Sequence, residues 1–179
     1  MTTALVRPAT PADLPVITAI YREAVLHGTA TFELEPPDEA EMAARLARIR
    51  GEGFPWFVAE LDGRVVGYAY YGWYRTRPAY RFTVEDSIYV DPAAHGRGVG
   101  RALLAALLDH ANAIGLRQMI AVIGDGANAA SVGLHGALGF HHVGVLKSTG
   151  WKLGRWLDSV LMQIDLGEGD TTPPVDRPR

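Results

Sequence analysis

Three glycines alternate with other residues in the run from His95 to Arg101, which reads His-Gly-Arg-Gly-Val-Gly-Arg. A glycine has no Cβ, so the backbone N–H groups of such a turn can come close to a ligand. The run follows a strand-like segment and opens a long apolar helix, whose first turn offers unpaired N–H donors and a partial positive charge. Arg97 and Arg101 would add charge-assisted hydrogen bonds to phosphate oxygens. The pattern therefore predicts a site for a pyrophosphate.

The glycine-rich turn does not match two familiar phosphate-binding motifs. The dinucleotide-binding pattern G-x-G-x-x-G, started at Gly96, meets Arg101 where it needs a glycine. Started at Gly98, it meets Leu103 where it needs glycine or alanine. A P-loop needs a Gly-Lys pair, which the sequence lacks. The alternative interpretation is a glycine-rich turn that holds no ligand.

Glu85 lies inside an apolar, β-branched segment that runs into the glycine-rich turn. Burial among such neighbours removes water from a carboxylate and raises its pKa toward a value that suits a general base. The alternative for Glu85 is a strand residue that faces solvent. The next residue, Asp86, is expected on the opposite face of the strand and in solvent.

Arg75 and Arg77 lie two residues apart in a segment that we expect to be extended. Their guanidinium groups would then face the same way, and two such groups can clamp an acidic ligand through paired hydrogen bonds. The alternative is a pair of solvated loop charges.

Composition excludes several other chemistries. The 179-residue chain has no cysteine, so disulfides, thiol nucleophiles and cysteine-ligated metals are ruled out. His141 and His142 are adjacent, and their rings would face opposite sides of a strand, so we expect no metal site. The nucleophile elbow G-x-S-x-G fails at Ser131, because residue 129 is alanine. The net charge of −3 argues against a protein that coats nucleic acid.

Hydrophobic periodicity and turn residues predict the elements that would position these side chains. The clearest signals are Asp62-Gly63, typical of a two-residue hairpin turn, and Thr10-Pro11, typical of a helix start. Strands are expected at residues 4–7, 56–61, 64–71, 82–90, 119–123, 140–146 and 156–164. Helices are expected from 10 to 28, from 36 to 51 or 53, at 99–114, and from 128 or 129 to 139.

The order β-α-α-β-β-β-α-β-α-β-β predicts an α/β fold, with an α+β mixed sheet and helices on both faces. We expect one domain over residues 1–166. Residues 167–179 combine prolines with mixed charge and few large apolar side chains, which predicts a disordered tail. The longest apolar run near the centre, residues 102–108, is far shorter than the roughly 20 residues of a membrane span. We therefore expect a cytoplasmic protein with neither membrane nor nucleic acid as a partner.

At the glycine-rich turn the sequence resembles the GNAT superfamily of acetyl-CoA-dependent N-acetyltransferases. The family's pattern Gln/Arg-x-x-Gly-x-Gly/Ala corresponds to the run from His95 to Gly100, with histidine at its first position. The block from Asn128 to Phe140 resembles the family's later Asn-x-x-Ser…Gly-Phe block, and the predicted element order is also the family's. The resemblance covers residues 4–166. It implies a GNAT-like fold and acetyl-CoA as the acetyl donor.

The resemblance also implies roles for individual residues. Glu85 matches a glutamate that takes a proton from the amine, which is mostly protonated near pH 7. His135 stands where many relatives carry a tyrosine that protonates the departing thiolate, although a histidine packed against the sheet is the alternative. The cofactor-binding positions would be Ile88, Tyr89, Val90, Gly96, Arg97, Gly98, Val99, Gly100, Arg101 and Asn128.

A closer resemblance links the chain to one branch, the phosphinothricin and methionine sulfoximine/sulfone N-acetyltransferases. It rests on residues 31–33, 74–90 and 154–158. It implies a small, amino-acid-like amine as substrate, and a homodimer. We expect direct attack in a ternary complex, because the chain has no cysteine and no evident activated serine. The substrate-binding positions would be Arg75, Thr76, Arg77, Glu85, Asp86 and Ser87.

Two alternatives remain open at this stage. A GNAT enzyme that acetylates a protein N-terminus or an aminoglycoside-like antibiotic would carry the same cofactor motif, although Arg75 and Arg77 favour an acidic small molecule. A non-catalytic acetyl-CoA-binding module would bind the cofactor without turnover. The presence of Glu85 speaks against that module.

Overall fold

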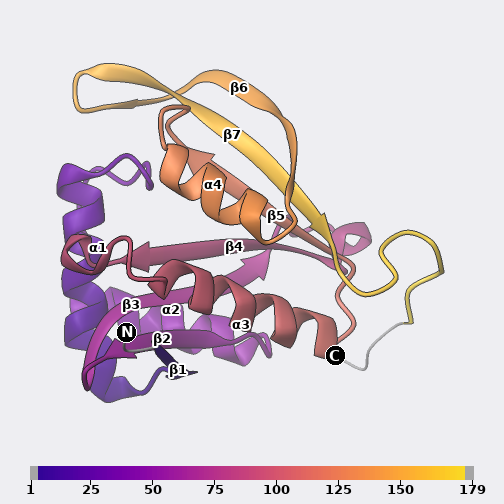
Figure 1. Ribbon diagram of the computed structural model, residues 1–179, viewed down its shortest axis with the longest axis horizontal. Coiled ribbons are helices and arrows are strands. Elements are labelled where there is room, and N and C mark those ends of the chain that lie inside the picture. The colour runs from indigo at the N-terminus through magenta and orange to yellow at the C-terminus, as the bar shows by residue number, and fades with distance from the viewer. Residues whose placement is uncertain (1–3, 176–179) are drawn as a thin grey trace.

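The computed structural model describes residues 4–175, which form seven strands and four α-helices in the predicted order (Figure 1). The helices are α1 (Leu14–His27), α2 (Glu39–Gly51), α3 (Val99–Ala113) and α4 (Ala129–Ala137). The strands are β1 (Leu5–Pro8), β2 (Trp56–Leu61), β3 (Arg64–Trp73), β4 (Thr83–Val90), β5 (Gln118–Gly124), β6 (His141–Lys152) and β7 (Arg155–Asp165).

The strands form one mixed sheet in the order β1-β2-β3-β4-β5-β7-β6. Neighbouring strands are antiparallel except β4 and β5, which are parallel. Parallel strands need a long crossover connection, and α3 provides it. The predicted mixed sheet with a parallel pair among its later strands is confirmed.

Helices cover both faces of this sheet, as the surroundings of two glycines in β3 demonstrate. A Cβ on Gly67 would lie 3.1 Å from Val99 of α3, whereas a Cβ on Gly72 would lie 3.2 Å from Ile49 of α2. Side chains alternate along a strand, so positions five apart face opposite sides. The α1–α2 pair therefore packs on one face, and α3 with α4 on the other (Figure 1).

The hairpin of β6 and β7 is longer than its sequence suggested. Its turn consists of Leu153 and Gly154, both with positive φ (50° and 74°). Leucine rarely adopts this conformation, so the pair gives a weaker turn signal than Asp62-Gly63, where the predicted hairpin is confirmed. The paired strands place exposed apolar side chains on a projecting ribbon.

The segment after β7 is held against the body by Arg117. This side chain donates hydrogen bonds to the carbonyl oxygen of Gly169 at 3.0 Å, to Oγ1 of Thr172 at 3.0 Å and to the carbonyl oxygen of Pro173 at 3.2 Å. Composition does not reveal such a distant hydrogen-bond donor, and the disorder of residues 167–179 stays a prediction. Residues 176–179 of the predicted tail lie outside the described part of the chain.

Candidate active site

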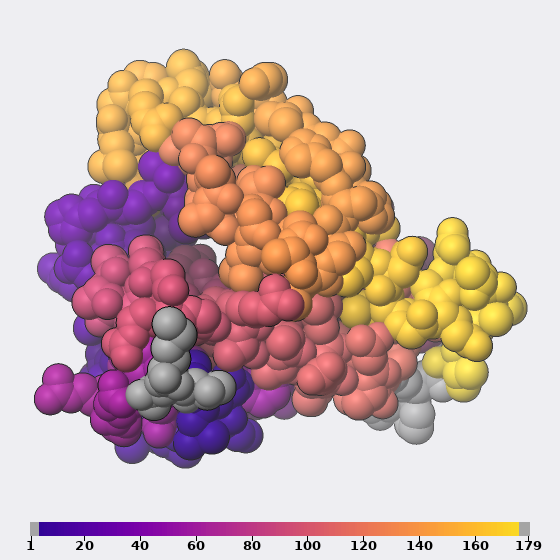
Figure 2. Space-filling view, viewed as in Figure 1, coloured from indigo at the N-terminus to yellow at the C-terminus, as the bar shows by residue number. Residues whose placement is uncertain are grey.

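A cavity opens in the sheet where β4 and β5 separate. Their parallel register runs only from Thr83 with Gln118 to Glu85 with Ile120. Beyond it lies a cavity of about 270 Å³, walled by residues 85–89 of β4 and 121–124 of β5. The α1–α2 connection, α4 with its N-cap Asn128, and Ser159 of β7 supply the remaining walls. Figure 2 shows this side of the molecule hollowed between the purple connection and the orange helix.

A second cavity of about 510 Å³ runs along the glycine-rich turn. Gly96 and Gly98 have φ of 73° and 79°, a conformation that strongly favours glycine. A Cβ at either position would meet nothing within 4 Å, so the space beside this backbone is open. The first turn of α3 begins directly after Gly98 and adds unpaired N–H donors. This arrangement has the open backbone and the donors that a pyrophosphate needs.

The two cavities meet beside the end of β4. Ile88, Tyr89, Asn128 and Ser131 line both of them, together with Ala30 of the α1–α2 connection. Residues 86–90 lie beyond the register with β5, so this edge of β4 faces the junction instead of a neighbouring strand. A ligand that entered along the glycine-rich turn would reach the first cavity by passing this edge.

Most of the predicted cofactor residues line the second cavity, which we call the cofactor groove, and one lies on the surface. Gly96, Gly98, Val99, Gly100, Arg101, Ile88, Tyr89, Val90 and Asn128 all line the groove or its junction. The Oδ1 atom of Asn128 also caps α4 by accepting a hydrogen bond from the N–H of Ser131 at 3.2 Å. Arg97 instead points toward the β2–β3 turn, where its Nη2 lies 3.5 Å from Oδ2 of Asp62.

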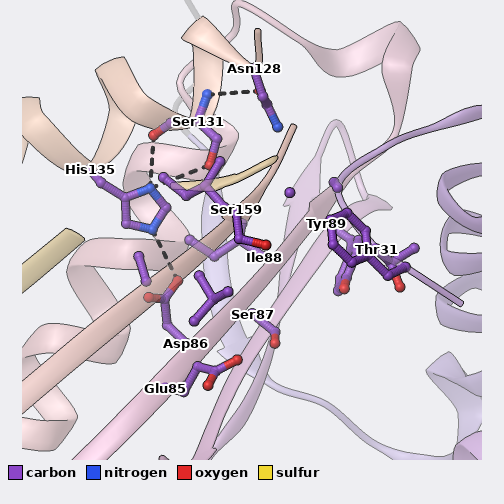
Figure 3. Close-up of a pocket in the computed structure, with 16 residues that line it drawn as sticks. Thr31, Glu85, Asp86, Ser87, Ile88, Tyr89, Asn128, Ser131, His135 and Ser159 are labelled. Atoms are coloured by element: carbon purple, nitrogen blue, oxygen red, sulfur yellow. Dashed lines mark hydrogen bonds and ion pairs between the residues drawn. The ribbon is translucent and has the colours of Figure 1, made fainter. Parts of the chain in front are cut away.

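Glu85 stands where the first cavity begins (Figure 3). Burial raises the pKa of its carboxyl above the usual range, and the negative charge of Asp86 acts in the same direction, whereas Arg75 opposes both. A carboxylate with a raised pKa, placed in a cavity, has the properties of a general base.

Asp86 is buried, which corrects the expectation that it faces solvent. It is 8% exposed, and its Oδ2 lies 3.1 Å from Nε2 of His135 (Figure 3). The expectation failed because both faces of β4 are covered, so that alternation along the strand does not produce a solvent-facing side. His135 in turn lies in α4, with Nδ1 2.8 Å from the carbonyl oxygen of Ser131.

The predicted substrate residues do not all come together. Ser87 lines the first cavity with Glu85 and Asp86. Arg75, Thr76 and Arg77 line a different cavity of about 820 Å³, formed with residues 51–54 and Phe82. Arg75 remains close enough to Glu85 to affect the pKa of its carboxyl. Its guanidinium carbon lies 4.5 Å from the ring centre of Tyr74.

The α1–α2 connection forms a further wall of the site, which the predicted site residues do not include. Thr31 and Phe32 line the first cavity. The Nζ atom of Lys152 in β6 donates a hydrogen bond to the carbonyl oxygen of Thr31 at 2.7 Å. Phe32 packs over Gly150, where a Cβ would lie only 2.5 Å from its ring. The sequence offered one signal, the run of residues 31–33 that carried part of the branch resemblance.

Residues 4–175 contain neither a candidate metal site nor a candidate membrane span. No group of three or more histidine, aspartate or glutamate side chains in this range could hold a metal ion. Among the described helices, none combines the length and the apolar character of a membrane-spanning segment.

Comparisons with known proteins agree with this geometry. A sequence profile described as the acetyltransferase (GNAT) family matches residues 17–140. The phosphinothricin N-acetyltransferase of Alcaligenes faecalis is 56% identical over 162 residues, covering 90% of this chain and 82% of the relative. The L-methionine sulfoximine/L-methionine sulfone acetyltransferase of Pseudomonas paraeruginosa is 44% identical over 171 residues, covering 95% of this chain and 99% of the relative.

A solved structure resembles the whole described fold. It is a GNAT superfamily phosphinothricin acetyltransferase from Sinorhizobium meliloti, in complex with AcCoA. It is 55% identical to this chain, with a TM-score of 0.95, and the match covers 98% of this chain and 95% of that one. The fold and family expected from the glycine-rich turn are thus confirmed. The chain belongs to the acetyltransferase (GNAT) family and is related to its phosphinothricin and methionine sulfoximine/sulfone acetyltransferases.

Proposed function

We propose that this chain transfers the acetyl group of acetyl-CoA to the amine of a small amino-acid-like substrate, of the phosphinothricin or methionine sulfoximine/sulfone type. The observation that carries the proposal is the meeting of two cavities at Ile88, Tyr89, Asn128 and Ser131. One cavity has the backbone donors for a pyrophosphate, and the other has a carboxylate suited to deprotonate an amine. A reaction between two bound molecules needs such a junction.

Different segments of the chain would bind different parts of acetyl-CoA. The turn from Gly96 to Gly100 and the first turn of α3 would hold the pyrophosphate, and Arg101 would add a full positive charge. The edge of β4 beyond Glu85 would pair with the pantetheine arm. When bound, acetyl-CoA supplies a thioester carbonyl, and backbone N–H groups of this edge would face its oxygen.

Glu85 would take a proton from the incoming ammonium group, directly or through a water molecule. An alkyl ammonium is mostly protonated at pH 7. A carboxylate with a raised pKa has a higher proton affinity and therefore accepts this proton more readily. His135 would return a proton to the departing thiolate. No covalent acetyl-enzyme is part of the proposal, because the chain has no cysteine.

The substrate class rests on the relatives and on the first cavity. A cavity of about 270 Å³ suits a molecule of amino-acid size. Arg75 and Arg77 would bind the acidic groups of the substrate from the neighbouring cavity, after a movement of their side chains toward Glu85. Thr76, Ser87 and Asp86 complete the proposed set.

A mass-spectrometric panel tests this function. The protein is incubated with acetyl-CoA and, in separate reactions, phosphinothricin, methionine sulfoximine, methionine sulfone, common amino acids, an aminoglycoside and a short peptide. We expect N-acetylated product from the first three. Product only from the peptide or the aminoglycoside would show that the substrate is not a small amino-acid-like amine but belongs to that other class. Acetyl-CoA binding by calorimetry without any product would identify a binding module instead.

We also propose a homodimer. Trp151 and Trp156 on the β6–β7 hairpin are 56% and 61% exposed, which is unusual for such large apolar side chains. Sedimentation equilibrium should give twice the chain mass of 19.4 kDa. A single-chain mass at micromolar concentration would contradict the dimer.

A further inference from the structure

The buried pair of Asp86 and His135 is the feature that the proposed base and the proposed cofactor groove leave unexplained. Their side chains are 3% and 4% exposed, and they join β4 to α4 across 49 residues of sequence. The Oδ1 atom of Asp86 is buried and has no hydrogen-bond partner among the described residues. A buried, half-satisfied carboxylate costs stability, so a structural role alone gives it little reason to be there.

Both ring nitrogens of His135 face acceptor oxygens. Nδ1 lies 2.8 Å from the carbonyl oxygen of Ser131, and a carbonyl oxygen accepts only, so Nδ1 carries a proton. Nε2 lies 3.1 Å from a carboxyl oxygen of Asp86, so a second proton lies between these two atoms. The pair therefore holds one more proton than a neutral imidazole beside a free carboxylate.

Burial by itself lowers the pKa of His135, but the hydrogen bond to Asp86, the charge of Asp86 and the carbonyl of Ser131 together outweigh it, so this pKa is raised. The other ionisable side chains lining the cavity are Glu85 and Tyr89 of β4. The facing part of β5, residues 121–124, is uncharged, β7 contributes Ser159, and the ring of Phe140 packs edge-on at 4.9 Å. Asp86 is thus the group that keeps the imidazole charged.

The charged ring lies next to the junction of the two cavities. The Oγ atom of Ser131 is 3.4 Å from Nδ1 of His135, and Ser131 lines both cavities (Figure 3). A proton that leaves Nδ1 therefore has a hydroxyl between it and the position where a thioester sulfur would lie.

We propose that Asp86 is a positioning residue that holds His135 as an imidazolium with Nδ1 directed toward Ser131, so that the pair supplies the proton taken up by the departing thiolate. In this step the Nδ1–H bond breaks as the Ser131 hydroxyl gains that proton. The hydroxyl's own proton passes to the sulfur and forms the S–H bond. An imidazolium and a thiolate become an imidazole and a thiol, and no further reactant is needed. The inference rests on the proposed acetyl transfer.

The test begins with the protonation state of His135 in the unmodified protein, read by nitrogen-15 NMR of its histidine rings. The chain has six histidines, and the signal missing from His135→Gln identifies the relevant one. We expect both ring nitrogens to be protonated at pH 7. A neutral ring at pH 7 overturns the proposal, with no variant of Asp86 required and whatever the acetyl acceptor proves to be.

The second arm replaces Asp86 by asparagine, whose amide can donate to Nε2 and so favours the neutral ring. We expect the titration of His135 to move down by about one to three pH units, because an opposite charge is removed. The alkaline limb of kcat should move in the same direction, while the KM for acetyl-CoA stays unchanged. Asp165→Asn is the matched control, since that carboxylate also joins two elements, β7 and β5, through Gln118 but lies on the surface.

These experiments distinguish a failure of the proposed role of Asp86 from a failure of the proposed acetyl transfer. Turnover with an unshifted alkaline limb in Asp86→Asn overturns the inference and leaves the function intact. A shifted titration of His135 in a protein that acetylates no amine contradicts the function, and it still confirms that Asp86 keeps the ring charged.

Discussion

Glu85 and Ile120 form the last pair of the parallel register between β4 and β5. Past this pair the strands separate, and the cavity begins beside the Glu85 carboxylate. Because both walls are strands of one sheet, the position of the carboxylate depends on strand register and not on a mobile loop. The same separation frees the edge of β4 that would meet the cofactor.

Replacing Glu85 by glutamine tests its role as a base. We expect kcat to fall by about 10²–10⁴-fold at pH 7, the usual contribution of a general base. The loss should shrink at high pH, where more of the amine is already unprotonated. Steady-state rates across pH check this, with the exposed Glu39→Gln as control. Unchanged turnover at pH 7 would remove Glu85 from the mechanism.

The proximity of Arg75 to Glu85 predicts that replacing Arg75 changes both the pH dependence of the reaction and the KM for the amine. Its positive charge lowers the pKa of Glu85, so Arg75→Ala should raise that pKa and move the ascending limb of kcat/KM to higher pH by about half a unit to one unit. The KM for the amine should also rise, with acetyl-CoA affinity unchanged. Arg75→Lys should restore the limb but not the KM, because lysine cannot bind a carboxylate bidentately. Weakened acetyl-CoA binding in calorimetry would contradict this prediction and remove Arg75 from the substrate-binding residues.

The contact between Phe32 and Gly150 predicts a specificity effect. A Cβ at residue 150 would lie 2.5 Å from the Phe32 ring, so Gly150→Ala should displace this wall of the cavity. We expect the KM for the amine to rise about tenfold, with the KM for acetyl-CoA unchanged. Gly144→Ala is the matched control, because a Cβ there meets nothing within 4 Å. Equal kinetics in the two variants would mean that Phe32 does not shape the substrate cavity.

Much of the fold was predictable because its signals are local. The Asp62-Gly63 turn, the boundaries of β2 and the glycine-rich start of α3 each depend on neighbouring residues. Alternation of side chains also placed Glu85 and Asp86 on opposite faces of β4. The same rule failed for the solvation of Asp86, because only the packing of α4 shows that the second face is covered.

The unpredicted parts of the site depend on contacts between distant segments. Lys152 binds the Thr31 carbonyl from 121 residues away, and nothing in either segment indicates the pairing. Arg117 holds the chain after β7 in the same way, across 52 residues to Gly169. Such long-range hydrogen bonds leave no periodic trace in the sequence, so composition alone suggested a disordered tail.

Stability should depend on Asp13, which directly precedes α1 as its N-cap residue. Its carboxylate accepts hydrogen bonds from both terminal nitrogens of Arg7 at 2.8 Å and from the N–H of Thr10 at 2.7 Å. The Arg7 guanidinium, opposed by burial, holds the pKa of Asp13 well below its usual range. A carboxyl of this kind stabilises the fold above its unfolded pKa of about 3.9, and that stabilisation is lost as pH falls toward the folded value.

Asp13→Ala should therefore lower the free energy of unfolding by about 1–3 kcal/mol at pH 7, since it removes the charged acceptor of part-buried hydrogen bonds from Arg7 and Thr10. Urea denaturation at pH 7 and at pH 3 measures the effect, with the exposed Asp109→Ala as control. The difference between Asp13→Ala and the unmodified protein should be smaller at pH 3. An equal or larger difference in acid would contradict the linkage.

The most direct measurement is the release of CoA from acetyl-CoA in the presence of phosphinothricin, followed with a thiol reagent. The chain contains no cysteine, so every thiol that appears comes from the cofactor. We expect amine-dependent thiol release that matches N-acetylated product one for one and that falls sharply in Glu85→Gln at pH 7. Thiol release without acetylated amine, or no release while acetyl-CoA binds tightly, would contradict it.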